Sequence, residues 1–168
     1  MSFVQAYQFT VPYEGGYVVD DGGPTMHGVT QAVYDAYRTA HKWPTQWVKM
    51  ISNFETHDIY LSQYWGPSSA QDLPTMSGIV HFDWSVDHGV EGAIKTMQEV
   101  LGVADDGIIG PITLAAMRAV NDTEFSGRYL DKRRLIYREI AANNPDDEQY
   151  LDGWLNRCDE LQNYITRL

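Results

Sequence analysis

Apolar residues recur at three- and four-residue spacing along most of this chain, which is the period of an amphipathic helix. Val90, Ile94, Met97 and Leu101 form the clearest stripe, and Gly102 follows it directly, as glycine often does where a helix ends. Weaker stripes predict further helices over residues 3–12, 30–40, 52–64, 125–140 and 151–165, and the mostly apolar residues 76–88 predict a buried helix.

Local signals mark where several of these helices begin. Ser2 with Gln5, and Ser52 with Glu55, have the spacing of a capping box. Pro111 stands where the first residue of another helix is expected. Only residues 16–29, rich in Gly and Val, favour strands. The pattern therefore predicts a mainly α fold with a small β-hairpin after the first helix.

Composition narrows the class of protein. The 168 residues, 43% of them hydrophobic, suit one domain with its own core. With 12 Lys and Arg against 23 Asp and Glu, the net charge is -11. That charge disfavours a nucleic-acid binder, which needs a basic face to neutralise phosphates. It equally disfavours docking on an anionic membrane by bulk charge. The lone cysteine, Cys158, forms no internal disulfide.

The sequence also bears on location. No Lys or Arg precedes Arg38, so the positive region that begins a secretory signal is missing. No apolar run approaches the roughly 18 residues that a membrane span needs. We therefore expect a protein made in the bacterial cytoplasm, with no stable membrane insertion.

The densest candidate chemistry lies in residues 14–29. Glu14 ends an aromatic-rich helix, whose rings exclude water and so raise the pKa of a carboxyl group. Asp20 and Asp21 stand in a polar, glycine-rich loop, where a carboxylate stays ionised. Glycoside hydrolysis requires two carboxyl groups with such opposite environments, and Thr25 is placed to orient a water molecule. A helix end followed by simple turns explains the same residues without catalysis.

This segment resembles glycoside hydrolase family 108, a lysozyme-like family of phage endolysins and related bacterial muramidases. The family's E-G-G-Y matches residues 14–17, its G-G-x-T matches 22–25, and its aromatic-Gly-Ile is echoed at 27–29. Further motifs follow in order at residues 59–67, 82–89, 101–114 and 153–157. The sequence departs from the family at His27, where Tyr is usual, and at Asp87, where Asn is usual.

The resemblance implies a lysozyme-like catalytic part over residues 1–88 and a helical, peptidoglycan-binding part over 89–168, packed as one unit. It implies hydrolysis of the β-1,4 bond between N-acetylmuramic acid and N-acetylglucosamine without metal or organic cofactor. Glu14 would be the general acid, Asp21 or Asp20 the second carboxylate, and Thr25 their helper. The implied substrate contacts are Tyr17, His27, Tyr64, Trp65 and Asp87; Tyr64 and Trp65 are equally good candidates for the core.

The biological role implied is that of a monomeric phage-type endolysin that acts on peptidoglycan glycan strands. A membrane-permeabilising partner, a holin, would release it to the wall. Two other functions stay open. A zinc amidase would draw its ligands from Cys158 and the five histidines, although no H-x-x-x-H or H-E-x-x-H pair occurs. A non-catalytic wall-binding or secretion-accessory protein would need no such site.

Three further features have structural interpretations that we favour. Residues 105–113 resemble the D-G-x-x-G-x-x-T turn of peptidoglycan-binding modules, but a capped loop between two helices explains them. The basic residues 132–134 with Arg138 are expected to form a solvated helix face paired with acids. Cys158 lies in an apolar stripe and is expected in the core.

Overall fold

Helix α4 (Thr75–His88) lies at the centre of the fold in a computed structural model that describes residues 3–20 and 22–168. Every residue of α4 from Ser77 to Ser85 is buried. The helix contacts α1 (Phe3–Thr10), α5 (Val90–Leu101), α7 (Asp122–Asn143) and α8 (Leu151–Ile165). A mostly apolar helix with neighbours on all sides is buried in this way. The buried helix predicted from residues 76–88 is therefore confirmed.

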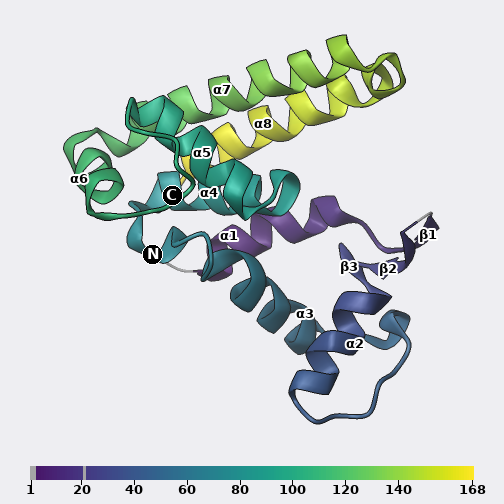
Figure 1. Cartoon of the computed structure of the whole chain (residues 1–168). Coiled ribbons are helices and arrows are strands. Elements are labelled where there is room, and N and C mark those ends of the chain that lie inside the picture. Colours follow the sequence, from purple (N-terminus) through teal and green to yellow (C-terminus); the bar gives the residue numbers. More distant parts are fainter. Residues whose placement is uncertain (1–2, 21) are drawn as a thin grey trace.

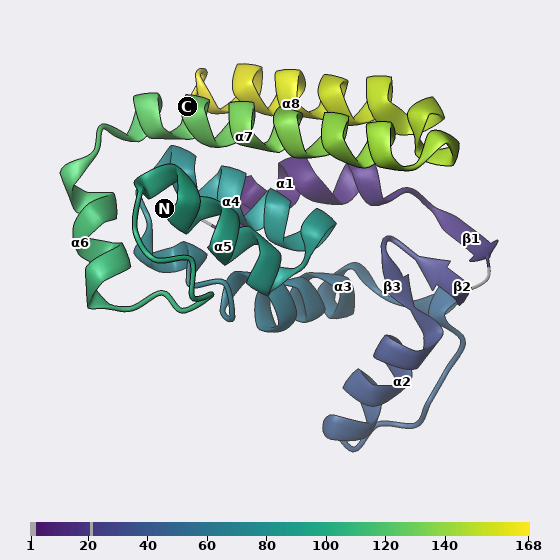
Figure 2. The same ribbon diagram turned by 45° about the horizontal axis from the view of Figure 1, so that its top comes forward.

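Helices α7 and α8 run side by side along one face of the molecule, joined by the short helix η5 (Pro145–Tyr150) (Figures 1 and 2). Helix α8 buries Cys158, Leu161 and Ile165, so the expected place of Cys158 in the core is confirmed. Helix α6 (Pro111–Ala119) begins at Pro111, as predicted.

A small lobe stands apart from these helices in both views (Figures 1 and 2). It contains a three-stranded antiparallel sheet, β1 (Tyr17–Asp20), β2 (Gly23–Met26) and β3 (Val29–Thr30), followed by α2 (Gln31–Ala40). The predicted hairpin corresponds to β1 and β2, where Tyr17 pairs with Met26. The predicted strand region, residues 16–29, reaches the first residue of β3, but a separate third strand is not predicted because two residues are too few to show a period.

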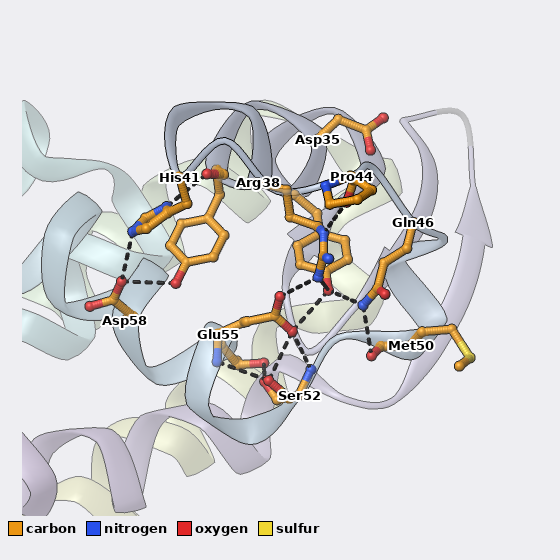
Figure 3. A network of polar contacts seen from close by, with 12 residues as sticks. Asp35, Arg38, His41, Pro44, Gln46, Met50, Ser52, Glu55 and Asp58 are labelled. Carbon is orange, nitrogen blue, oxygen red and sulfur yellow. Dashed lines mark hydrogen bonds and ion pairs between the residues drawn. The ribbon is translucent and has the colours of Figure 1, made fainter.

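Helix α3 (Asn53–Tyr60) connects this lobe to the bundle, and buried polar contacts hold α2 against it (Figure 3). The carboxylate of Glu55 accepts hydrogen bonds from the hydroxyl of Tyr34 at 2.9 Å and from the guanidinium of Arg38 at 2.5 Å. It also caps its own helix at Ser52, which confirms the predicted capping box. A buried carboxylate that is paired in this way fixes the angle between α2 and α3. The loop between them carries η2 (Val48–Met50).

The chain continues from α3 into a π-helix, η3 (Leu61–Trp65), and later a short helix η4 (Ala70–Asp72). The π-turn shifts the register of the side chains that follow it. The end of α5 at Gly102, which has φ of +73°, is as predicted. Both Ser2, of the other expected capping box, and Asp21 lie outside the described residues. Of the helices in residues 3–20 and 22–168, none is long and apolar enough to cross a membrane.

The turn over residues 105–113 is organised by the buried side chain of Gln98. Its amide donates hydrogen bonds to the carboxylate of Asp106 at 2.8 Å and to the carbonyl of Ile108 at 3.0 Å, and it accepts one from the backbone of Gly107 at 2.9 Å. These contacts support the structural interpretation of the turn.

The expectation of a solvated basic face is wrong at one residue. Lys132 pairs with Glu99, and Arg134 pairs with Asp159, at the surface. Arg133 instead has no exposed surface and points into the core, because it neutralises a buried carboxylate of α4.

Candidate functional site

Glu14 is the last residue of the short helix η1 (Val11–Glu14), which prolongs α1. Its side chain is 20% exposed. A Cβ added to Gly28 would lie 3.3 Å from Oε2 of Glu14 and 2.6 Å from the hydroxyl of Tyr60, so only glycine permits this close approach. The chain therefore places the carboxyl of Glu14 against the turn between β2 and β3.

Behind Glu14 lies a buried network of charges that begins at Arg157 of α8. Nη2 of Arg157 donates to Oε1 of Glu14 at 3.0 Å and to Oδ1 of Asp83 at 2.8 Å. The other oxygen of Asp83 accepts from Arg133 at 2.7 Å, and the hydroxyl of Thr10 donates to Asp83 at 3.0 Å. Asp83 and Arg133 are 0% exposed, so this network is part of the core.

These surroundings set the proton affinity of Glu14. Burial raises the pKa of Glu14, and the guanidinium of Arg157 opposes the rise. The carboxylates of Asp83 and Asp87 raise it further, and the net shift of the pKa is upward. A raised carboxyl pKa is what a general acid near neutral pH requires. This is the direction that the sequence predicts for Glu14.

Tyrosines of α3 and η3 line the other side of Glu14. The hydroxyl of Tyr60 donates to the carbonyl of His27 at 2.9 Å, and Nδ1 of His27 donates to the carbonyl of Gly15 at 2.9 Å. Burial, and then the charge of Glu14, raise the pKa of Tyr64, whose ring centroid lies 5.4 Å from that of Tyr60. These contacts hold the turn at His27 and the backbone at Gly15 around the carboxyl group.

A hollow of about 590 Å³ opens beside this turn. It lies between α1, the Gly15–Gly16 segment and the start of α3, and is lined by Tyr7, Gln8, Val11, Pro12, Gly15, Gly16, His27 and Asn53. A second hollow of about 510 Å³ on the far side of Gln8 and Pro12 is lined partly by α8. Both hollows have the size of a typical small-ligand site, and the first is the one that His27 lines.

Two predicted catalytic residues lie in the sheet. Thr25 is in β2, opposite Val18 of β1, and its hydroxyl donates to the carbonyl of Gly23 at 3.3 Å. The backbone of Asp20 ends β1 and pairs with Gly23. Thr25 and the backbone of Asp20 thus share one hairpin; Asp21 lies outside the described residues.

The predicted substrate contacts separate into different surroundings. The ring of Tyr17 lies against Trp47, with centroids 5.6 Å apart, and under the ammonium group of Lys49. Asp87 accepts a hydrogen bond from Tyr137 at 2.8 Å and lies 3.8 Å from Arg157, so it belongs to the charge network.

Trp65 is predicted either as a substrate contact or as a core residue, and the structure places it in the core. It is 6% exposed and packs against Phe3 and Phe82, with centroids 5.5 Å and 5.7 Å away. Its rings are therefore covered by the core and not free to stack on a sugar. Tyr64, which precedes it in the π-turn, is only partly buried.

Four residues around Glu14 were given no role from the sequence: Gly28, Tyr60, Asp83 and Arg157. Each stands inside a motif noted for its resemblance, but the pairing of Asp83 with Arg157 spans 74 positions. In the sequence, this pairing is signalled only by an Asp inside an otherwise apolar helix, because a buried charge needs a partner of opposite charge.

No group of three or more His, Cys, Asp and Glu side chains is arranged to hold a metal ion in residues 3–20 and 22–168. His81 is buried between the hydroxyl of Tyr129 at 2.9 Å and the carbonyl of Ser68 at 3.0 Å. His88 stacks on Trp84. Both histidines thus have structural partners.

Comparison with known proteins gives two matches to family models. The model described as "Glycosyl hydrolase 108" matches residues 7–89, and one described as "Predicted Peptidoglycan domain" matches residues 92–159. The solved structure of Brucella abortus SagA is similar at 28% identity and a TM-score of 0.78, covering 96% of this chain and 91% of SagA. No curated protein matches the chain. The mainly α, lysozyme-like fold is confirmed.

Proposed function

We propose that this chain, which belongs to glycosyl hydrolase family 108 and carries a peptidoglycan domain, is an N-acetylmuramidase. The family and the domain together make the chain a glycoside hydrolase that acts on peptidoglycan. It cleaves the β-1,4 bond between N-acetylmuramic acid and N-acetylglucosamine. The observation that carries the proposal is the partly buried carboxyl of Glu14, whose pKa is raised and whose neighbour Gly15 lines an open hollow together with His27.

In this mechanism Glu14 enters the reaction protonated and gives its proton to the glycosidic oxygen as the bond to the sugar breaks. Positive charge then develops on the sugar carbon, and Asp21 or Asp20 stabilises it or activates a water molecule, with Thr25 as helper. A carboxyl separation of about 5–5.5 Å would give retention, and one of about 6.5–9.5 Å would give inversion. His27 and Tyr64 contact the glycan.

The test is Glu14→Gln, which keeps the shape of the side chain and removes its titrating proton. We expect the variant to fold normally and to lose nearly all hydrolysis of purified peptidoglycan. Glu139→Gln, an exposed change on α7, is the matched control and keeps full activity. Lysis by Glu14→Gln at the rate of the unchanged protein would contradict the assignment.

Analysis of the released fragments separates this function from the other two. New reducing ends on muramic acid indicate a muramidase. Freed amino termini indicate an amidase, and binding without any release indicates a wall-binding protein. The role of a monomeric phage-type endolysin, made in the cytoplasm and released by a holin, belongs to the same proposal and rests on the family resemblance alone. Co-expression with and without a holin tests it.

A further inference from the structure

Arg157 reaches Glu14 from the opposite end of the chain. It stands in α8, 143 positions away, within the residues matched to the predicted peptidoglycan domain. Glu14 lies within the residues matched to the hydrolase. A side chain from the region matched to a peptidoglycan domain thus contacts the carboxyl of Glu14.

We propose that Arg157 is a positioning residue for Glu14, so that the C-terminal part completes the catalytic site in addition to any contact with the wall. This inference rests on the proposed role of Glu14. It assigns α8 a task in the reaction that neither matched family description contains.

The guanidinium of Arg157 is held rigidly before it meets Glu14. Its Nε lies 3.2 Å and 3.3 Å from the two oxygens of Asp83, and its Nη2 lies 2.8 Å from one of them. The ring of Tyr13 covers the guanidinium at 5.0 Å. An arginine fixed by a carboxylate and an aromatic face loses little further freedom on orienting a second carboxylate.

The contact also decides which oxygen of Glu14 carries the catalytic proton. Arginine has only donors, so Oε1, which receives Nη2–H of Arg157, stays an acceptor. The proton of the acid form therefore resides on Oε2, the oxygen near Gly28. That turn also carries His27, which lines the hollow.

The charge of Arg157 is shared among several carboxylates. It contacts Glu14, Asp83 and, at 3.8 Å, Asp87. Among the described residues, the titratable and charged groups that surround Glu14 come from α8, α4, η1, α3, η3 and the turn before β3: Arg157, Asp83, Asp87, Tyr13, Tyr60, Tyr64 and His27. A change at Arg157 or Asp87 therefore alters the proton affinity of Glu14.

The two changes act in opposite directions. Arg157 lowers the pKa of Glu14, so its removal moves that pKa up. Asp87 raises the pKa of Glu14, so Asp87→Asn moves it down. Because the general acid must be protonated, the high-pH limb of the activity profile follows that pKa. We expect the limb to move to higher pH in Arg157→Met and to lower pH in Asp87→Asn.

The experiment uses the full chain and measures kcat and KM on soluble glycan fragments across pH. Arg157→Met should lower kcat by roughly 10²-fold with little change in KM, since misplacing a catalytic group costs about that much. Arg157→Lys, which keeps the charge, should recover part of kcat. Arg134→Met removes an arginine paired with Asp159 at the surface and is the control that keeps both constants.

An arginine that only stabilised the core, without contact to Glu14, would lower activity on removal without moving the pH limb. Opposite shifts in Arg157→Met and Asp87→Asn support the inference, and unmoved limbs overturn it. If Arg157→Met does not fold, the other two variants test the inference. It is overturned if the high-pH limb stays in place in Asp87→Asn and kcat is unchanged in Arg157→Lys.

Carbon-13 NMR titration of the Glu14 carboxyl separates this inference from the proposed function. If the protein cleaves no glycan, the function fails, and the titration of Glu14 in Arg157→Met still measures how Arg157 acts on that carboxyl. If Glu14→Gln abolishes cleavage while the Arg157 variants cleave normally at every pH, only the inference fails.

Discussion

A single substitution that removes the carboxylate of Asp83 should clearly destabilise the protein. This carboxylate is 0% exposed and is the ion-pair partner of both Arg133 and Arg157. Asp83→Asn keeps the volume of the side chain and removes only its charge. The fully buried guanidinium of Arg133 is then left without a carboxylate.

Removing one partner of a buried ion pair costs about 3–5 kcal/mol, because the other charge remains buried and uncompensated. The same substitution at Asp159, which is 65% exposed and pairs with Arg134, should cost at most about 1 kcal/mol. Because the two changes are chemically identical, the difference between them isolates the effect of burial.

Urea unfolding, followed by circular dichroism, measures this difference. With a slope of about 2 kcal/mol per M, the midpoint for Asp83→Asn should fall by roughly 1.5–2.5 M, and for Asp159→Asn by at most about 0.5 M. Equal midpoints for Asp83→Asn and the unchanged protein would refute the reasoning that the network stabilises the core.

The difference in stability between Asp83→Asn and the unchanged protein depends on pH, and the direction of that dependence can be predicted. Burial alone would raise the pKa of Asp83, but Arg133 and Arg157 hold it below its usual value. A group with a lowered pKa in the folded state contributes stability above the unfolded pKa of about 3.9. That contribution is lost as the pH falls through the folded pKa. The stabilities of Asp83→Asn and the unchanged protein should therefore converge in acid.

Two other predictions concern the approach to Glu14 and the surface charge. Gly28→Ala should lose most activity and roughly 2 kcal/mol of stability in urea unfolding, since its Cβ would lie 2.6 Å from the hydroxyl of Tyr60 at a backbone φ of +73°. Gly102→Ala has the same φ with nothing within 4 Å, so it should lose stability but keep activity; full activity in Gly28→Ala would contradict the close approach. At a net charge of -11, activity on peptidoglycan should gain less from low salt than that of a cationic lysozyme, and a steep loss with added salt would argue against this.

The parts of this fold that could be predicted from sequence depend on neighbouring residues. The capping box at Ser52, the stop at Gly102 and the start at Pro111 each involve contacts within a few positions. The π-turn over Leu61–Trp65 and the two-residue strand β3 are each too short to leave a period in the sequence that would predict them.

In the candidate site, too, the residues that the sequence predicts are those marked by their neighbours in the chain. Glu14 is marked by its own segment, a helix end followed by glycines. Arg133 has charged neighbours at the surface, and only the fold reveals that it points inward to Asp83, 50 positions earlier. The sequence does not distinguish Arg133 from Lys132, because the two residues are both basic and adjacent.

The network also links the regions that the two family models describe separately. Asp83 belongs to the region matched as a hydrolase, and both of its guanidinium partners belong to the region matched as a peptidoglycan domain. Without α7 and α8, a carboxylate that is now fully buried would lose its ion-pair partners, and Glu14 would lose Arg157. A charge in an apolar interior is tolerated only when it is paired. The two regions therefore depend on each other electrostatically at the point where the chemistry is proposed to occur.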